Sequence, residues 1–367
     1  MEWPIVNLSP TNLTCMKTAQ REVRVVEAPI PAPAEGEVIV RMTLAALCGT
    51  DMHILDESPL NPDMLPAGAQ GLPMGHEAVG IVVAVGPGVR NLHEGQRVVA
   101  SCLTACGRCP QCLEGQMSAC SGGGSLLFGC QANYFRVPFA DVGAAPVPDG
   151  LCDEQVLFAG DIMSTGLGAI ERADLKFGES VVVFGQGPVG LCATAGARAR
   201  GAGLIVAVES VPERAEMARQ LGANVVVDPT TEDPVSAILQ LTGPIGADVA
   251  VEAVGLQQTM DLATRIVRRG GTVSSVGVYG GLPGVMLPAG TSSFYHRKVV
   301  FTLCPSGVAR LQQLMHLVQF GGLDLTPLIT HRMPLSQAPE AYEMFRSRKA
   351  LKVVLLPELS GAPGMAV

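Results

Sequence analysis

The chain has 367 residues, and at about 150 residues per domain this length predicts two domains with a sizeable core. Hydrophobic residues make up 48% of the sequence and charged residues 16%, which excludes a disordered or coiled-coil protein. Twenty-five Lys and Arg stand against 33 Asp and Glu, so the net charge is −8. Because no basic stripe stands out, we expect no nucleic-acid partner.

The sequence also argues against a membrane protein. Gly, Pro or a charge interrupts every apolar run before it reaches the roughly 18 residues that a membrane span needs. The segment 1–15 lacks the basic start and apolar stretch of a secretory signal, so we expect a cytoplasmic protein. In that compartment the eleven cysteines predict metal binding or burial rather than a disulfide framework.

The first part of the chain, from about residue 21 to 150, consists of short valine-rich runs broken by Gly and Pro. Runs of this kind predict a compact β-rich domain. The predicted strands are EVRVVEAP (22–29), EVIVRMTLAAL (37–47), AVGIVVAVG (78–86) and QRVVAS (96–101).

From Val181 onward, apolar strands alternate with helices, which predicts a parallel sheet covered on both faces. The predicted strands are 180–184, 204–209, 223–228, 248–255, 271–280 and 298–303, and the helices are 188–200, 212–221 and 259–269. After Cys304 a helix at about 308–319 and the strand 351–357 are expected to return to the first domain. We therefore predict a β-rich domain over 1–163, a domain of alternating strands and helices over 164–303 and a returning segment over 304–367.

A dinucleotide-binding fingerprint follows the strand 180–184. It reads Gly185-Gln186-Gly187-Pro188-Val189-Gly190 and opens a helix. The first Gly allows the tight turn, the second lets a pyrophosphate approach the backbone, and the third lets helix and strand pack closely. The N–H groups at the start of the helix would then face the phosphates.

The acidic partner of this fingerprint is Glu209, which ends the next strand, 19 residues past Gly190. A carboxylate there accepts hydrogen bonds from the adenosine ribose and repels a 2′-phosphate, so we expect NAD in preference to NADP. Arg214, a few residues further on, leaves NADP open as the alternative.

One group of cysteines has the spacing of a closed metal site. Cys106, Cys109, Cys112 and Cys120 form C-x2-C-x2-C-x7-C with glycines between them. Four thiolates can close a tetrahedral shell around a structural zinc ion, which would fix a loop and take no substrate. An iron–sulfur site or free thiols are the alternatives.

A second, dispersed set of metal ligands is Cys48, His76 and Asp161. One Cys, one His and one carboxylate, with a fourth position left for water or alcohol, make an open zinc site. Taken singly, each residue also has an ordinary explanation. Cys48 can be a buried thiol, His76 a hydrogen-bonded loop residue and Asp161 a helix cap.

These motifs together resemble the zinc-dependent medium-chain alcohol dehydrogenases over about residues 20–356. Gly75-His76-Glu77-x2-Gly80-x5-Gly86-x2-Val89 matches the zinc signature of that family. The segments GDIMSTG (160–166) and CPSG (304–307) are similar to the microbial secondary-alcohol dehydrogenase branch. The resemblance implies an α/β fold, with a Rossmann doubly wound parallel sheet and a β-rich, GroES-like catalytic domain.

The resemblance also assigns roles to single residues. It implies that Cys48, His76 and Asp161 bind the catalytic zinc, with Asp161 where the animal enzymes have a second Cys, and that Glu77 can approach the metal. The remaining roles are that Thr50 hydrogen-bonds the alcohol, His53 relays its proton, Asp51 orients His76, and Thr165 lies near the nicotinamide. Gly49 stands where some relatives carry a phosphate-binding Arg, so that contact must come from elsewhere.

The expected function is therefore reversible hydride transfer between a primary or secondary alcohol and NAD, with two zinc ions per chain. A polyol, amino-alcohol or aldehyde dehydrogenase on the same scaffold is the alternative enzyme. A nucleotide-binding regulator without turnover is an alternative of another class. The resemblance further implies a homotetramer or else a homodimer.

Overall fold

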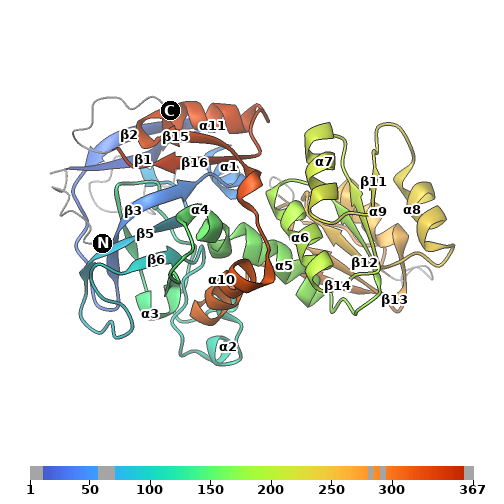
Figure 1. The fold of residues 1–367 in the computed structure, drawn as a ribbon, viewed down its shortest axis with the longest axis horizontal. Helices are drawn as coiled ribbons and strands as arrows, with labels where there is room; N and C mark the ends of the chain where they lie inside the picture. The colour runs from blue at the N-terminus through green and yellow to red at the C-terminus, as the bar shows by residue number, and fades with distance from the viewer. Residues whose placement is uncertain (1–10, 57–70, 280–283, 290–294, 359–367) are drawn as a thin grey trace. The chain divides into compact units, whose positions relative to one another are not determined.

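The chain divides between Gly160 and Asp161 into two units. In this computed structural model, the described residues are 11–56, 71–279, 284–289 and 295–358 (Figure 1). Unit 1 comprises Met1–Gly160, Ser306–Met315 and Thr326–Val367, and unit 2 comprises Asp161–Pro305 and His316–Leu325.

Unit 1 is built on a seven-stranded sheet with the order β15-β16-β3-β5-β6-β8, in which β7 also pairs with β3. The strands are β3 (Val38–Ala46), β5 (Glu77–Val85), β6 (Arg97–Ala100), β7 (Tyr134–Val137), β8 (Ala144–Pro146), β15 (Ile329–Pro334) and β16 (Lys352–Leu356). Ala46 at the end of β3 pairs with Glu77 at the start of β5. This antiparallel register brings the residues that follow β3 next to those that precede β5.

A small sheet and several short helices complete unit 1. The sheet has the order β2-β1-β4, formed by β1 (Asn12–Ala19), β2 (Glu22–Ala28) and β4 (Leu72–Pro73). The helices are α1 (Gly49–Asp56), α2 (Pro110–Leu113), α3 (Ala140–Gly143), α4 (Asp153–Val156) and α11 (Ala338–Arg346), with 3-10 turns at 117–119, 157–160, 326–328 and 335–337. A further helix, α10, is formed by Val308–Gly321.

Unit 2 contains a parallel six-stranded sheet with the order β11-β10-β9-β12-β13-β14. The strands are β9 (Ser180–Phe184), β10 (Leu204–Val208), β11 (Val225–Val227), β12 (Ala247–Glu252), β13 (Val267–Ser275) and β14 (Lys298–Phe301). The helices are α5 (Ile162–Arg172), α6 (Pro188–Ala199), α7 (Pro212–Gln220), α8 (Pro234–Thr242) and α9 (Gln257–Ile266). The helix α6 packs against α5 and α7, whereas α8 packs against α9, so the helices form two groups on the sheet (Figure 1).

The predicted fold class is confirmed, and one helix boundary was wrong. The expected helix 259–269 ends at Ile266, because Val267 already pairs with Ala247 in the sheet. The residues after it are drawn into β13, where the side chain of Arg268 pairs with Asp248 on β12. Tertiary pairing therefore overrides the helical pattern of this segment.

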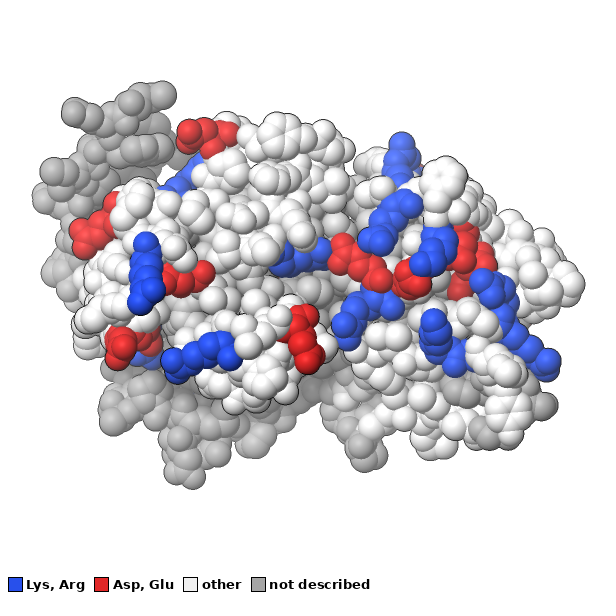
Figure 2. All heavy atoms as spheres, turned by 90° about the horizontal axis from the view of Figure 1, so that it is seen from below, with Lys and Arg blue, Asp and Glu red and all other residues white. Residues whose placement is uncertain are grey.

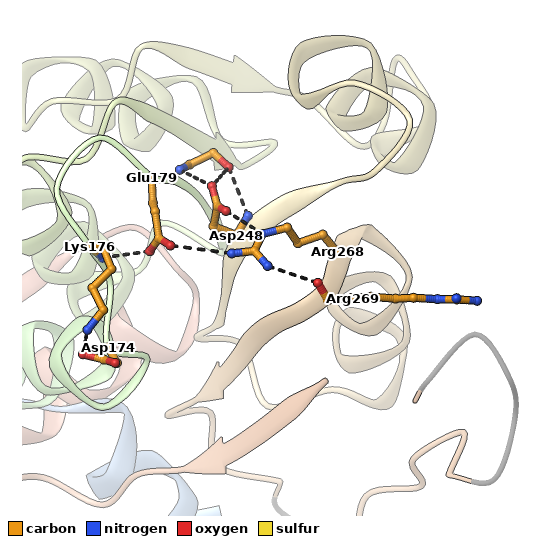
Figure 3. A network of polar contacts seen from close by, with 7 residues as sticks. Asp174, Lys176, Glu179, Asp248, Arg268 and Arg269 are labelled. Atoms are coloured by element: carbon orange, nitrogen blue, oxygen red, sulfur yellow. Dashed lines mark hydrogen bonds and ion pairs between the residues drawn. The ribbon is translucent and has the colours of Figure 1, made fainter. Parts of the chain in front are cut away.

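Charged side chains join three strands at the amino end of this sheet (Figure 3). Nε of Arg268 donates to Oδ1 of Asp248 at 2.6 Å, and Arg268 also lies 3.6 Å from the carboxylate of Glu179. Oδ2 of Asp248 accepts hydrogen bonds from the backbone N–H and the hydroxyl of Ser180. The network thus links the starts of β9, β12 and β13 at the edge opposite to the fingerprint.

Among the described residues, no helix combines the length and the apolar character needed to cross a membrane. On the face drawn in Figure 2, basic side chains lie beside acidic ones and do not gather into a stripe of one sign.

Candidate active site and metal centres

Three possible metal ligands meet in unit 1 where β3 ends and β5 begins. Cys48 follows β3, and His76 and Glu77 stand at the start of β5, so the register of these two strands brings them together. One donor atom from each residue lies within 4.8 Å of the others, and all three side chains are buried. A thiolate, an imidazole and a carboxylate in this arrangement suit a zinc ion.

A chain of buried polar groups holds the imidazole of His76. Nδ1 of His76 lies 3.1 Å from Oδ1 of Asp51, and Oδ2 of Asp51 accepts from the backbone N–H of Cys48 at 3.0 Å. The same oxygen accepts from Nε2 of Gln131 at 3.2 Å, and Oε1 of Gln131 accepts from the hydroxyl of Tyr342 at 2.8 Å. Asp51 therefore lies behind His76 and leaves Nε2 of the imidazole as the nitrogen that could bind a metal.

Glu77 is held by a buried lysine from the far end of the sequence. Nζ of Lys352, the first residue of β16, donates to Oε1 of Glu77 at 2.7 Å and to the carbonyl of Leu47 at 2.7 Å. Neither charged side chain is exposed to solvent. The ring of Phe158 lies 5.8 Å from the ammonium group. This ion pair fixes one oxygen of a carboxylate that stands directly beside His76, a possible metal ligand.

The two residues predicted to handle the proton lie on α1. The hydroxyl oxygen of Thr50 is 3.9 Å from Sγ of Cys48, so this side chain borders the metal ligands. His53 stands three residues further on, which places it on the same side of the helix.

Asp161 and Thr165 belong to the start of α5. Asp161 follows Gly160, whose carbonyl accepts a hydrogen bond from the backbone N–H of Cys102 at 2.9 Å. Asp161 occupies the N-cap position of α5, but its side chain makes no capping hydrogen bond, so the explanation as a helix cap is wrong. Its Oδ1 instead accepts from the hydroxyl of Thr165 at 3.3 Å, and both side chains are buried.

The four clustered cysteines form a second group of possible metal ligands. The sulfur atoms of Cys106, Cys109, Cys112 and Cys120 all lie within 4.8 Å of one another. Hydrogen bonds from backbone N–H groups, the largest effect being that of Cys112, lower the pKa of Cys109 to about 5. A similar bond from the N–H of Cys106 lowers the pKa of Cys120. The loop thus stabilises the thiolates of Cys109 and Cys120, the form that binds metal, whereas burial raises the pKa of Cys112 to about 12.

The fingerprint adopts the conformation that its glycines predict. Gly185 has φ of +80°, and a Cβ at Gly190 would approach the carbonyl oxygen of Gly185 to 1.9 Å. A Cβ at Gly187 would meet nothing within 4 Å, so the backbone there borders open space. Pro188 and Val189 begin α6 directly after it. The loop can therefore receive a phosphate against its backbone.

Glu209 is positioned at the end of β10 by its own hydrogen bonds. Its Oε2 accepts from the N–H of Gln186 in the fingerprint loop at 2.8 Å. Its Oε1 accepts from the N–H groups of Ser210 and Val211 at 2.8 and 2.9 Å. The carboxylate is thus fixed beside the loop, where it can face an adenosine ribose.

Sequence reasoning missed three residues of the site in unit 1. Gln131, Tyr342 and Lys352 are buried and contact Asp51 or Glu77 directly or through one another. None of them belongs to a motif. A lysine at the start of the apolar run 352–356 was the one available signal, since a charge there must either face solvent or find a buried partner.

The sheets, the open group of Cys, His and carboxylate, and the fingerprint define a zinc-dependent dehydrogenase that uses a nicotinamide nucleotide. The family model "Alcohol dehydrogenase GroES-like domain" matches residues 34–149, and the model "Zinc-binding dehydrogenase" matches residues 188–319. The chain belongs to the zinc-dependent medium-chain alcohol dehydrogenase family.

Several relatives are similar over most of their length. An alcohol dehydrogenase of Cupriavidus necator is 38% identical and covers 91% of this chain and 96% of that protein. An NADP-dependent isopropanol dehydrogenase of Thermoanaerobacter brockii is 34% identical over 83% of this chain and 88% of its own. The solved structure of alcohol dehydrogenase TADH from Thermus sp. ATN1 superimposes with a TM-score of 0.85 at 34% identity, covering 94% of this chain and all of that one.

Proposed function

We propose that the protein is a zinc- and NAD-dependent alcohol dehydrogenase that interconverts an alcohol with its aldehyde or ketone. The observation that carries the proposal is the buried meeting of Cys48, His76 and Glu77 at the end of β3 and the start of β5, with Asp51 behind the imidazole. A bound zinc ion supplies Lewis acidity that lowers the pKa of an alcohol, and NAD supplies the hydride acceptor.

We propose Asp161 as the third protein ligand beside Cys48 and His76. Its backbone begins directly at Gly160, which a hydrogen bond from Cys102 anchors in unit 1. These three residues would hold the zinc ion and would leave a fourth position for the substrate. Glu77, whose Oε1 is held by Lys352, would stand near the ion.

Two residues of α1 would transfer the proton that the alcohol loses. The hydroxyl of Thr50, next to Cys48, would accept the proton of the alcohol as the hydride leaves carbon. His53, on the same side of the helix, would carry this proton on to solvent through the nicotinamide ribose. Asp51 keeps the imidazole of His76 in the tautomer that binds metal. Thr165 lies beside Asp161 and would border the nicotinamide.

The test is the appearance of NADH absorbance on addition of a panel of primary, secondary, polyol and amino alcohols. Cys48→Ala and His76→Ala should each reduce kcat to background while the folded state, followed by circular dichroism, is retained. Full activity in either variant would contradict the scheme. His53→Gln should slow turnover modestly and change its pH profile, and an unchanged profile would exclude the relay.

The preference for NAD rests on Glu209. Three backbone N–H groups fix its carboxylate next to the fingerprint loop, where it would repel a 2′-phosphate. Comparing kcat/KM for NAD and NADP tests this, and a clear preference for NADP would favour a role for Arg214 instead.

We also propose two zinc ions per chain, the second held by the four cysteines of 106–120. Metal analysis should give two zinc ions and no iron, and a visible absorbance band would point to an iron–sulfur site instead.

A homotetramer, or else a homodimer, is proposed from the resemblance, and light scattering at several protein concentrations would distinguish the two. The eleven cysteines form no disulfide in this structure, which fits a reducing compartment such as the cytoplasm.

A further inference from the structure

A buried carboxylate with five hydrogen bonds lies at the carboxyl end of β12 in unit 2. Glu252 is not exposed to solvent at all. Its two oxygens accept from the N–H groups of Val254 (2.9 Å) and Gly255 (2.8 Å) and from the hydroxyls of Thr259 (2.8 Å), Ser275 (3.0 Å) and Tyr279 (2.7 Å). Because its own chain supplies these donors, Glu252 is suited to hold the backbone rather than to bind a ligand.

The network ties together the two segments that follow β12 and β13. Gly277 comes so close to the first segment that a Cβ there would lie 2.4 Å from both Oε2 of Glu252 and the N of Gly255. Burial raises the pKa of Tyr279, and the neighbouring Glu252 adds to this, so the phenol stays protonated and donates its hydrogen. The ring of Tyr279 packs edge-on against Phe301 of β14, with 6.4 Å between centroids.

The strand order indicates what these segments face. In an open parallel sheet a dinucleotide binds outside the carboxyl ends of the strands, at the point where the strand order reverses. Here that point lies between β9 and β12, with β10 and β11 on one side and β13 and β14 on the other (Figure 1). The fingerprint follows β9 and Glu209 follows β10. We therefore expect the adenosine half of the dinucleotide on the side of β10 and β11. The second nucleotide then lies over the ends of β12 and β13.

We propose that Glu252, Ser275 and Tyr279 are positioning residues that set the backbone of 253–255 and 276–279 for the nicotinamide half of the cofactor. This inference rests on the proposed function, because it assumes a nicotinamide dinucleotide. A fixed pair of segments presents its N–H and C=O groups in one arrangement, so less ordering is needed when the nicotinamide nucleotide binds. The adenosine half does not depend on these residues.

The experiment compares two ligands on the full zinc-loaded chain. NADH carries both halves of the cofactor, whereas ADP-ribose lacks the nicotinamide. Tyr279→Phe removes one hydroxyl and keeps the ring that packs on Phe301. We expect this variant to raise the Kd of NADH roughly three- to tenfold, the effect of one typical hydrogen bond, and to leave the Kd of ADP-ribose unchanged. Both values can be measured by calorimetry.

Two further variants make the result specific. Ser275→Ala removes the other hydroxyl that donates to Oε2 of Glu252. This variant should also raise the Kd of NADH and leave the Kd of ADP-ribose unchanged. Tyr295→Phe removes an exposed hydroxyl from the same unit and should change neither Kd. Equal weakening of both ligands in Tyr279→Phe would show a merely structural role and overturn the inference, as would no change in either. If the unaltered protein binds ADP-ribose but not NADH, the proposed function itself fails.

Discussion

At the residue scale, Lys352 places a positive charge where solvent does not reach. Its partner Glu77 is equally buried, and the two are joined at 2.7 Å. Removing one member of such a pair leaves the other charge uncompensated. Lys352→Met should therefore lower the free energy of unfolding by about 3–5 kcal/mol, measured by urea denaturation.

Two variants serve as comparisons for this prediction. Lys352→Arg keeps the charge and should retain more of the stability. Glu154→Gln breaks a partly exposed pair with Arg332 and should change stability by no more than about 1 kcal/mol. A loss in Lys352→Met no larger than that in Glu154→Gln would contradict the importance of the buried pair.

Asp51 acts on the metal through His76. Asp51→Asn keeps the size of the side chain but removes the charge that holds the imidazole at 3.1 Å. The affinity of the site for zinc should fall about 10- to 100-fold, measured by competition with a chromophoric chelator. Asp141→Asn is the matched control, because Asp141 only accepts exposed backbone N–H groups of Arg90 and Asn91. Equal zinc affinity in Asp51→Asn and the unaltered protein would exclude the orienting role.

Spacing along the sequence predicts those candidate residues that lie in contiguous motifs. The cysteines of 106–120 and the glycines of 185–190 form their sites within one loop, so spacing alone indicates the chemistry. Gln131 and Tyr342 are 211 residues apart, and their contact depends on the packing of α11 in unit 1. Spacing cannot reveal such a pair, because it arises only when the tertiary structure has formed.

At the element scale, the parallel sheet of unit 2 is fastened at its amino end by side chains. Arg268 on β13 joins Asp248 on β12 and Glu179 before β9 (Figure 3). Arg268→Ala should lower the free energy of unfolding by about 1–2 kcal/mol. Arg219→Ala removes a surface pair with Glu216 and should cost less than about 0.5 kcal/mol. Equal stability of the two variants would show that the network does not stabilise the sheet.

The same network predicts a dependence of stability on pH. Burial raises the pKa of Asp248, but hydrogen bonds from Ser180 and Arg268 outweigh it and bring the pKa below its ordinary value. The carboxylate thus stabilises the fold fully above the unfolded pKa of about 3.9, and this contribution is lost as the pH falls through the lower folded value. Asp248→Asn should show a shallower loss of stability below about pH 4 than the unaltered protein, followed by urea denaturation at stepped pH. An equal loss of unfolding free energy with falling pH in the two proteins would contradict this.

Elements were predicted best where the pattern is local. The valine-rich runs before the fingerprint and at residues 204–208 and 247–252 each form a strand. The strand β1, with the sequence NLTCMKTA, was not predicted. Its Lys17 is buried, and Nζ donates to the carbonyl of Ile54 at 2.6 Å. A strand that contains a buried lysine cannot be recognised from its sequence pattern, because the group that binds the lysine lies elsewhere in the chain.

At the scale of the whole molecule, the four clustered cysteines belong to unit 1 and the fingerprint belongs to unit 2. NADH should therefore slow hydrogen exchange around β9, α6 and β10, while removal of zinc by a chelator should speed exchange around residues 104–125. Mass spectrometry of peptides from each unit measures both effects in one experiment. Protection by NADH confined to unit 1 would contradict the assignment.

The position of β16 between β15 and β3 has a consequence for biosynthesis. This strand is made after nearly all the rest of the chain, yet it fills an inner place in the sheet and delivers Lys352 to Glu77. On the ribosome unit 2 can finish folding first, whereas the sheet of unit 1 must wait for β16. A polypeptide released before residue 352 would carry an open slot in its sheet and become a substrate for quality-control proteases.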